Sequence, residues 1–321
     1  MKKNNTLALL LILSFSGISF AAQEAANTDF TKELTTLEKE FDFSAGHRRD
    51  SFDWNIAGDM NGQNPNILSE LKWKDLSIFQ VNAGAKLTFD KKARIEGSYG
   101  YGWIYDGDNQ DSDYLGDDRT WEFSRSNNKA EGDNVSNWSV GLGYQFNLDK
   151  ISDYLVCESA AITLLGGYSQ HNQNLIMTDG SQTIPDTGSF AGLDSTYETE
   201  WKGPWLGVEL EGTKGKITGF FRYEHHWADY HADANWNLRD DFAHPVSFSH
   251  DADGKGDLIT VGTGYNISNS WLMYIKADIQ MWKADAGVDR TFLSDGTSSD
   301  TRLNQVNWKS TAILLGLKFR I

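Results

Sequence analysis

An alternation of apolar and polar residues with a period of two constrains the fold of this chain more than any other feature. In segment 271–281 every odd-numbered residue is apolar, whereas the polar Lys276, Asp278 and Gln280 share the even parity. Segment 313–321 repeats the pattern, with Lys318 and Arg320 opposite the apolar row. Because successive side chains of a strand point to opposite faces, each segment predicts a β-strand with one apolar face.

The first 21 residues predict an export signal. Lys2 and Lys3 precede a mostly apolar stretch from Leu7 to Ile18, and Ser19-Phe20-Ala21 fits a cleavage site between small residues. The alternative is a membrane anchor, but the stretch is shorter than the roughly 20 residues of a spanning helix. We therefore expect residues 1–21 to be a signal peptide and the protein to be exported.

Beyond the signal, the alternation favours a transmembrane β-barrel. No later stretch has about 18 consecutive apolar residues, so no transmembrane helix is expected. A barrel needs an apolar outer face and a polar interior, although a soluble sandwich shows similar alternation. Three features favour the barrel, namely export, a final strand at 303–321, and 12 Trp, 12 Tyr and 17 Phe that could form interfacial girdles.

The lengths of the connections give the strand count. Short polar connections, interpreted as periplasmic turns, fall at 90–92, 213–216, 266–270 and within 148–158. Long acidic connections, interpreted as extracellular loops, fall at 49–67, 106–133, 178–194, 231–245 and 288–302. They separate ten strands at 38–48, 68–89, 93–105, 134–148, 159–177, 195–212, 216–230, 246–265, 271–287 and 303–321. We therefore expect an all-β, antiparallel barrel at 38–321 in a bacterial outer membrane, after a polar lead-in at 22–37.

Charge and cysteine content exclude other classes. Asp and Glu outnumber Lys and Arg by 45 to 29, giving a net charge of −16. This argues against a nucleic-acid partner, which requires basic residues opposite phosphates. Cys157 is the single cysteine, so no internal disulfide can form.

Several segments, read as parts of ten strands, resemble a known family. They are Ser69 to Lys74, Gly166-Gly167-Tyr168, Tyr197 to Gly207, Phe221-Arg222-Tyr223, Gly262 to Tyr265 and Leu315 to Phe319. Together they resemble the omptin family of outer-membrane proteases over most of the chain. The resemblance implies an omptin-like ten-stranded barrel and an aspartic-type endopeptidase acting at an extracellular cleft.

The resemblance also implies a catalytic set. Asp229 and His231 match the omptin Asp-x-His segment, with Asp229 as the orienting group and His231 as the general base. Asp111 and Asp113, before the aromatic Tyr114, match the opposing Asp-x-Asp and would hold the attacking water. An imidazole takes a proton from water, and its Asp partner stabilises the imidazolium.

Bland interpretations of these residues remain open. Asp229 and His231 share parity with the apolar Phe221 and Tyr223, and would point outward unless the strand extends above the membrane or carries a bulge. Acidic external loops are common, so the Asp pair could be simply solvated. Calcium at the Asp pairs, or zinc at His226, Asp229 and His231, lacks the usual ligand patterns, and we expect no cofactor and no metal.

Two departures from the family concern partners. Asn172 and Glu200 stand where lipopolysaccharide-binding omptins have arginine, although Tyr168 and Lys202 are compatible. Trp227 stands where an acidic residue would select basic substrates. The expected partners are outer-membrane lipid and peptide or protein substrates. Lipopolysaccharide is a further possible partner, although its binding motif is poorly kept.

Two functions follow from the sequence. The first is an omptin-like endopeptidase that uses Asp111, Asp113, Asp229 and His231. The second is a non-catalytic surface barrel, such as a narrow porin, an adhesin or a structural protein. The enzyme requires the Asp pair and His231 to face each other across one cleft.

Overall fold

The computed structural model describes residues 36–148 and 157–321. The expected signal peptide, most of the lead-in and most of the turn within 148–158 lie outside the described residues. The strands are β1 (Leu37–Ile56), β2 (Ser69–Phe89), β3 (Ala93–Gly116), β4 (Thr120–Lys129), β5 (Asn134–Asn147), β6 (Ser159–Ile184), β7 (Asp186–Ser189), β8 (Asp194–Lys214), β9 (Ile217–Asn235), β10 (Phe248–Asn266), β11 (Trp271–Ala284), β12 (Gly287–Phe292) and β13 (Ser298–Arg320). A three-residue 3₁₀ turn, η1 (Asp117–Arg119), joins β3 to β4.

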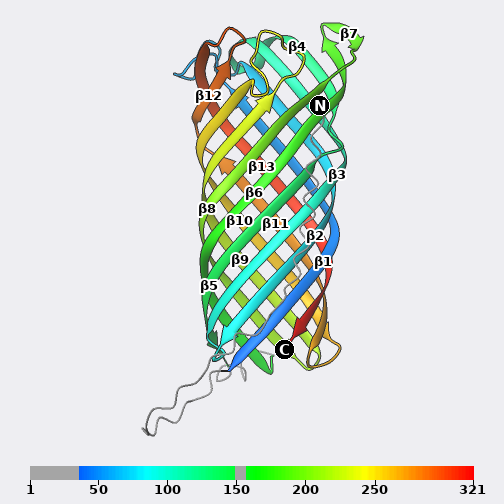
Figure 1. Ribbon diagram of the computed structural model, residues 1–321, viewed down its shortest axis with the longest axis vertical. Coiled ribbons are helices and arrows are strands. Elements are labelled where there is room, and N and C mark those ends of the chain that lie inside the picture. The colour runs from blue at the N-terminus through cyan, green and yellow to red at the C-terminus, as the bar shows by residue number, and fades with distance from the viewer. Residues whose placement is uncertain (1–35, 149–156) are drawn as a thin grey trace, which may run out of the picture. The chain divides into compact units, whose positions relative to one another are not determined.

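The sheet is antiparallel and closes on itself, because β1 pairs with both β2 and β13 (Figure 1). In the described part of the chain, the ring is built from β1, β2, β3, β5, β6, β8, β9, β10, β11 and β13. At one end β4 takes the place of β5 between β3 and β6, and β12 takes the place of β11 between β10 and β13. The expected ten-stranded barrel is therefore confirmed.

The strands extend further than the sequence analysis predicts at the end that carries the long connections. Residues 49–56 belong to β1, and the expected loop 106–133 consists largely of strands β3 and β4. Strand pairing satisfies backbone hydrogen-bonding groups that a loop would leave to water. The barrel wall therefore continues beyond the apolar belt described next, and by analogy with outer-membrane barrels this end is extracellular.

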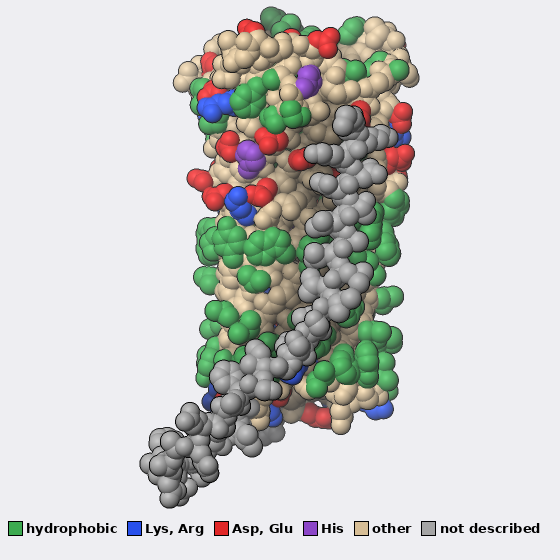
Figure 2. Space-filling view, viewed as in Figure 1, with side chains coloured by type: hydrophobic (Ala, Val, Ile, Leu, Met, Phe, Trp, Pro, Cys, Tyr) green, Lys and Arg blue, Asp and Glu red, His purple; other side chains and the backbone are tan. Residues whose placement is uncertain are grey.

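The outer wall carries an apolar belt. Leu315 is 65% exposed, whereas Lys318, of the other parity on the same strand, is 7% exposed and faces the lumen, as the alternation predicts. Figure 2 shows hydrophobic side chains in a broad band over the lower part of the barrel, with acidic, basic and histidine side chains above it. No helix in the described residues is long and apolar enough to cross a membrane.

The interior holds an aromatic core. Six tryptophans that the sequence analysis would place in interfacial girdles are instead buried: Trp54, Trp73, Trp201, Trp205, Trp282 and Trp308. Five of them, all but Trp205, belong to one contiguous cluster. That cluster also takes side chains from β3, β5, β6, β9 and β10, so every strand of the ring contributes to it. Packed side chains therefore fill the cross-section of the barrel at this level.

Candidate functional site

A pocket of about 520 Å³ lies at the external end of the barrel, above the aromatic core. Its walls come from β1–β4, β6, β8, β10, β12 and the connection 236–247. Trp54 and Phe248 of the core also line the pocket, whereas Phe123 and Leu238 are about half exposed at its rim. The pocket therefore opens outward and is closed below by the core.

Asp111 and Asp113 both line this pocket. Register explains their position. Asp111 pairs with Leu71 of β2 and Ser126 of β4, and Leu71 pairs with Trp54 of β1. Directly opposite residues share a face of the sheet, so this row points into the barrel as a unit.

A register shift between β2 and β3 decides this orientation. In the lower part of β3 the even-numbered residues face the lumen, for example Glu96 and Ile104. The pairing shifts between Lys74 and Ile78 of β2, opposite residues 104–108 of β3. Above the shift the odd-numbered residues Asp111 and Asp113 face inward. A bulge has therefore moved both carboxyls to the inner face.

The surroundings of the two carboxyls favour their protonated forms. Burial raises the pKa of Asp111 well above its ordinary value, and the neighbouring charge of Asp113 raises it further, against a smaller opposing effect of Arg239. Burial also raises the pKa of Asp113, although hydrogen bonds from Ser69 and Ser124 and the charge of Arg239 oppose the rise. The guanidinium of Arg239 is held by Asp241, with Nε–Oδ1 and Nη2–Oδ2 distances of 2.9 and 2.8 Å.

Asp229 and His231 belong to β9 and lie on its outward face, so they point away from the pocket. Pairing of β9 with β10 is continuous from Ile217 to Ala234, without a bulge, so both residues keep the outward parity of Phe221 and Tyr223. His231 is about half exposed, and its Nδ1 lies 2.8 Å from Asp251 Oδ1, while its Nε2 lies 3.4 Å from Asp233 Oδ1. Asp229 faces the same side as Lys202, its pairing partner on β8.

The structure therefore does not bring the four sequence-predicted site residues together. Asp111 and Asp113 face the interior, whereas Asp229 and His231 face the surroundings of the barrel. The inward positions of β9 at this level are Tyr230 and Ala232, which cannot serve as a general base for water at neutral pH. A cleft with the Asp pair on one side and His231 on the other is absent from the described residues, which corrects that expectation.

An inward Asp–His pair does exist, and the sequence analysis missed it. His250 of β10 is fully buried; its Nε2 lies 3.1 Å from Asp289 Oδ1, and its Nδ1 lies 2.7 Å from the hydroxyl of Tyr197. Thr301 donates to the other oxygen of Asp289 at 2.8 Å. Both ring nitrogens are occupied and the ring is out of contact with solvent, so this pair is structural. His250 lies two residues after the core residue Phe248 and therefore on the same face of β10. This spacing could have identified His250 from the sequence.

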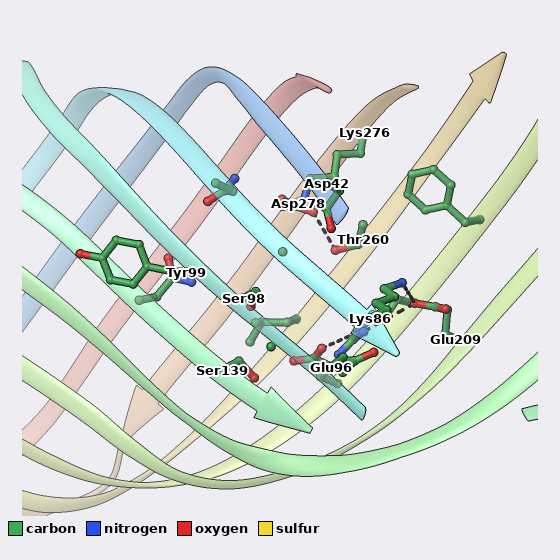
Figure 3. A pocket seen from close by; sticks show the side chains of 18 of the residues that line it. Asp42, Lys86, Glu96, Ser98, Tyr99, Ser139, Glu209, Thr260, Lys276 and Asp278 are labelled. Carbon is green, nitrogen blue, oxygen red and sulfur yellow. Dashed lines mark hydrogen bonds and ion pairs between the residues drawn. The ribbon is translucent and has the colours of Figure 1, made fainter. Parts of the chain in front are cut away.

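The membrane-level lumen below the core contains a network of ion pairs. Arg94 contacts Glu209 at 2.5 Å. Lys86 contacts the same carboxylate at 3.3 Å (Figure 3). Arg222 contacts Glu96 at 2.7 Å. These charges compensate one another within about a hydrogen-bond length, as buried charges require.

The alternative sites from the sequence are not assembled either. His226 is buried inside the barrel, so the suggested zinc ligands His226, Asp229 and His231 are divided between its two faces. Among the described residues no group of three or more His, Cys, Asp and Glu side chains could hold a metal ion. Trp227, at the expected acidic specificity position, is half exposed on the outer wall.

The stretch that corresponds to the lipopolysaccharide motif of omptins makes contacts within the protein. Glu200 accepts a hydrogen bond from Gln170 at 2.7 Å and contacts the ammonium group of Lys202 at 2.5 Å. The one basic residue of the motif is thus paired with a carboxylate.

The chain matches a family model and shares the fold of a solved outer-membrane protein. The family model described as Pom, Protochlamydia outer membrane protein, matches residues 42–321. No curated protein matches. The chain is similar to the outer membrane protease OmpT from Escherichia coli, with a TM-score of 0.67 and 14% identity over 92% of this chain and 99% of that chain. The toluene transporter TodX from Pseudomonas putida aligns with a TM-score of 0.30 and 7% identity over 87% and 89%. The likeness to OmpT concerns the fold alone.

Proposed function

Since this chain belongs to the Protochlamydia outer membrane protein family, we propose that it is an outer-membrane barrel that binds a ligand in its external pocket and is closed to passage through its lumen. The filled cross-section beneath the pocket carries this proposal. A cavity that opens at a half-exposed rim and ends on a packed aromatic floor suits retention better than conduction. Its volume lies in the range of small-molecule sites, roughly 300–1,000 Å³.

Bilayer conductance tests whether the lumen is closed. The folded chain, inserted in a planar bilayer, is expected to give no stepwise current at neutral pH. Trp282→Ala combined with Trp308→Ala removes two stacked rings, 5.4 Å apart, from the middle of the core and is expected to produce measurable current. Stable open-channel steps from the unmutated protein would contradict the proposal and favour the narrow porin.

A pocket-filling variant tests binding. Ser126→Trp places a large ring beside Asp111 inside the pocket, whereas Lys129→Trp adds the same ring to the exposed face of the same strand. Saturation-transfer NMR with a mixture of small polar, cationic and aromatic probes should show contacts that Ser126→Trp abolishes and Lys129→Trp preserves. Equal spectra for the two variants would place any binding outside the pocket.

An omptin-like endopeptidase is the second candidate function. The inward Asp111 and Asp113 support it, because one half of the expected catalytic set does face a cavity in a barrel with the fold of OmpT. The outward position of His231 opposes it. In this proposal extracellular peptides or proteins are the substrates, and lipopolysaccharide is included in the assay as a possible activator.

A mixed peptide library distinguishes the two functions. A general base contributes about 10²–10⁴-fold to a rate, so an omptin-type mechanism predicts that His231→Ala nearly abolishes cleavage in a folded barrel. Cleavage that survives His231→Ala but is lost in Asp111→Asn would place the chemistry in the pocket without His231. The binding proposal predicts no cleavage by the unmutated protein.

A further inference from the structure

The walls of the external pocket combine aromatic rings with short neutral polar side chains. The polar members include Ser69, Ser124, Ser126, Asn128, Gln182 and Ser195. These hydroxyl and amide groups each donate and accept hydrogen bonds without carrying charge. Such a wall matches a ligand whose own polar groups are neutral and can do both.

Aromatic side chains lie beside these groups; Trp236 is only partly buried, whereas Trp54 and Phe248 are almost fully buried. Trp236 meets Phe248 edge-on with ring centroids 4.6 Å apart, and Phe248 meets Trp54 in the same way at 5.7 Å. All three line the pocket. A pyranose ring exposes C–H groups on one face and hydroxyls around its edge, so it can pack on such a ring while its edge reaches the polar wall.

Two buried polar atoms of the wall lack partners. Within the described residues, neither the indole Nε1–H of Trp54 nor the side-chain oxygen of Asn128 has a hydrogen-bond partner, although both residues line the pocket. One is a donor and the other an acceptor. Leaving such groups unpaired destabilises the unliganded pocket. A hydroxylated ligand that displaces the wall slightly could satisfy both.

The charges in the pocket also favour a neutral ligand. Asp111 and Asp113 lie in surroundings that favour protonation, and a protonated carboxyl both donates and accepts. Arg239, the basic residue in the wall, is held by Asp241 and is partly exposed. His250 and Thr301 both bond to Asp289, the third acid in the wall. Apart from Asp111 and Asp113, whose protonation burial favours, the charged side chains of the described wall are paired within the protein.

We infer that the ligand of the external pocket is a short neutral saccharide, bound by stacking on Trp236 and by hydrogen bonds to the carboxyls of Asp111 and Asp113. This inference rests on the proposed binding function and adds the class of ligand. The pocket lies at the extracellular end, where saccharides are accessible without crossing the core.

Binding is measured on the full chain, folded in an amine-oxide detergent, because sugar-based detergents would occupy the site. The probes are methyl glycosides of glucose, galactose and N-acetylglucosamine, together with maltose, lactose and diacetylchitobiose. Benzylamine and hexylamine serve as cationic probes of similar size. Saturation-transfer NMR identifies the ligand, and titration calorimetry gives its dissociation constant.

The expected result is binding of at least one saccharide. Asp111→Leu, which removes both hydrogen-bonding atoms, should weaken it roughly tenfold or more, and Asp111→Asn, which retains a donor and an acceptor, should weaken it less. Ser126→Trp should abolish binding, and the outward Lys129→Trp should leave it unchanged. The electrophoretic heat-modifiability of each variant verifies folding.

The other outcomes separate the two proposals. Binding of the amines with no saccharide bound overturns this inference and leaves the proposed binding function intact. Saccharide binding that Ser126→Trp does not affect overturns the assignment to this pocket. No bound probe, together with open-channel steps in a bilayer, overturns the binding function itself.

Discussion

Two regions of the barrel wall carry similar sequence patterns and face opposite ways. On β3, Asp111 and Asp113 point into a pocket and are partly buried. On β9, Asp229 and His231 point outward, and His231 contacts Asp251 on the exposed face of β10. In both regions two polar residues are spaced by two along a strand near its external end. The motif alone therefore does not determine which environment its side chains enter.

The difference lies in the strand pairing beneath each motif. The β2–β3 pairing shifts near residues 104–108, and the shift exchanges the inward and outward residues. The β9–β10 pairing runs without interruption, so the residues above Tyr223 keep its outward direction. The presence or absence of a bulge several residues away thus decides whether a carboxyl can participate in chemistry inside the barrel.

The largest expected effect tests the inner and outer faces at the level of His231. Trp201 is fully buried, and its ring centroid lies 4.4 Å from that of Tyr230, whereas the next residue, Lys202, faces outward opposite Asp229. Trp201→Ala should lower the free energy of unfolding by about 3–5 kcal/mol. Urea-induced unfolding in lipid vesicles measures this, with Lys202→Ala, which should change it little, as the control. Equal losses would show that the inner face is not the packed one.

A smaller effect distinguishes the outer wall within the membrane from the outer wall above it. Leu315 pairs with Ile275, which lies near the middle of the outward apolar row of β11 from Trp271 to Met281. Leu315→Arg should lower the free energy of unfolding in vesicles by roughly 2–4 kcal/mol, because it puts a charge near the bilayer midplane. His231→Arg places the same side chain on the same outer face above the belt and should cost far less. A similar cost at both positions would place His231 within the membrane.

The smallest expected effect is a difference between Asp111 and His231 in how each makes the stability of the fold depend on pH. The pKa of Asp111 is raised on folding, so the folded state binds the proton more tightly and stability falls as pH rises from about 3.8 through the raised pKa. For His231, burial lowers the pKa, but the hydrogen bond that its ring donates to Asp251 and the charge of Asp233 raise the pKa overall. Its contribution is present below pH 6.5 and is lost as pH rises through the raised pKa.

Thermal melting in detergent between pH 4 and 9 separates these contributions. Asp111→Asn should flatten the decline that begins near the ordinary carboxyl pKa, and His231→Gln should change only the weaker decline above about 6.5. Identical profiles for Asp111→Asn and the unmutated protein would show that folding does not raise the pKa of Asp111.

Most of the architecture is predictable from the sequence, because alternation is a local pattern. The outward rows of β11 and β13, their polar partners, and the short turns at 90–92 and 213–216 are visible without tertiary information. The extension of β3 to Gly116 is not visible in this way. Its residues are polar and acidic, and only pairing with β2 and β4 makes them a strand.

The site is less predictable, because its geometry depends on contacts between distant segments. The orientation of Asp111 depends on a bulge shared with β2, which no local pattern marks. No short sequence motif marks the pair of His250 and Asp289, because the two residues are 39 positions apart. For His231, by contrast, the parity shared with Phe221 already indicated the outward direction found in the structure.

The seam between β1 and β13 has a consequence for the kinetics of assembly. Glu40 and Arg320, which are hydrogen-bonded across it, are 280 residues apart in the sequence. Contacts of such separation form slowly, because the intervening chain must first be ordered. Until β1 pairs with β13 from Glu40 to Ile56, both strands have unpaired edges that can form hydrogen bonds with strands of other molecules. Closure of this pair is therefore the step at which a nascent barrel either becomes resistant to aggregation or is captured by a neighbouring chain.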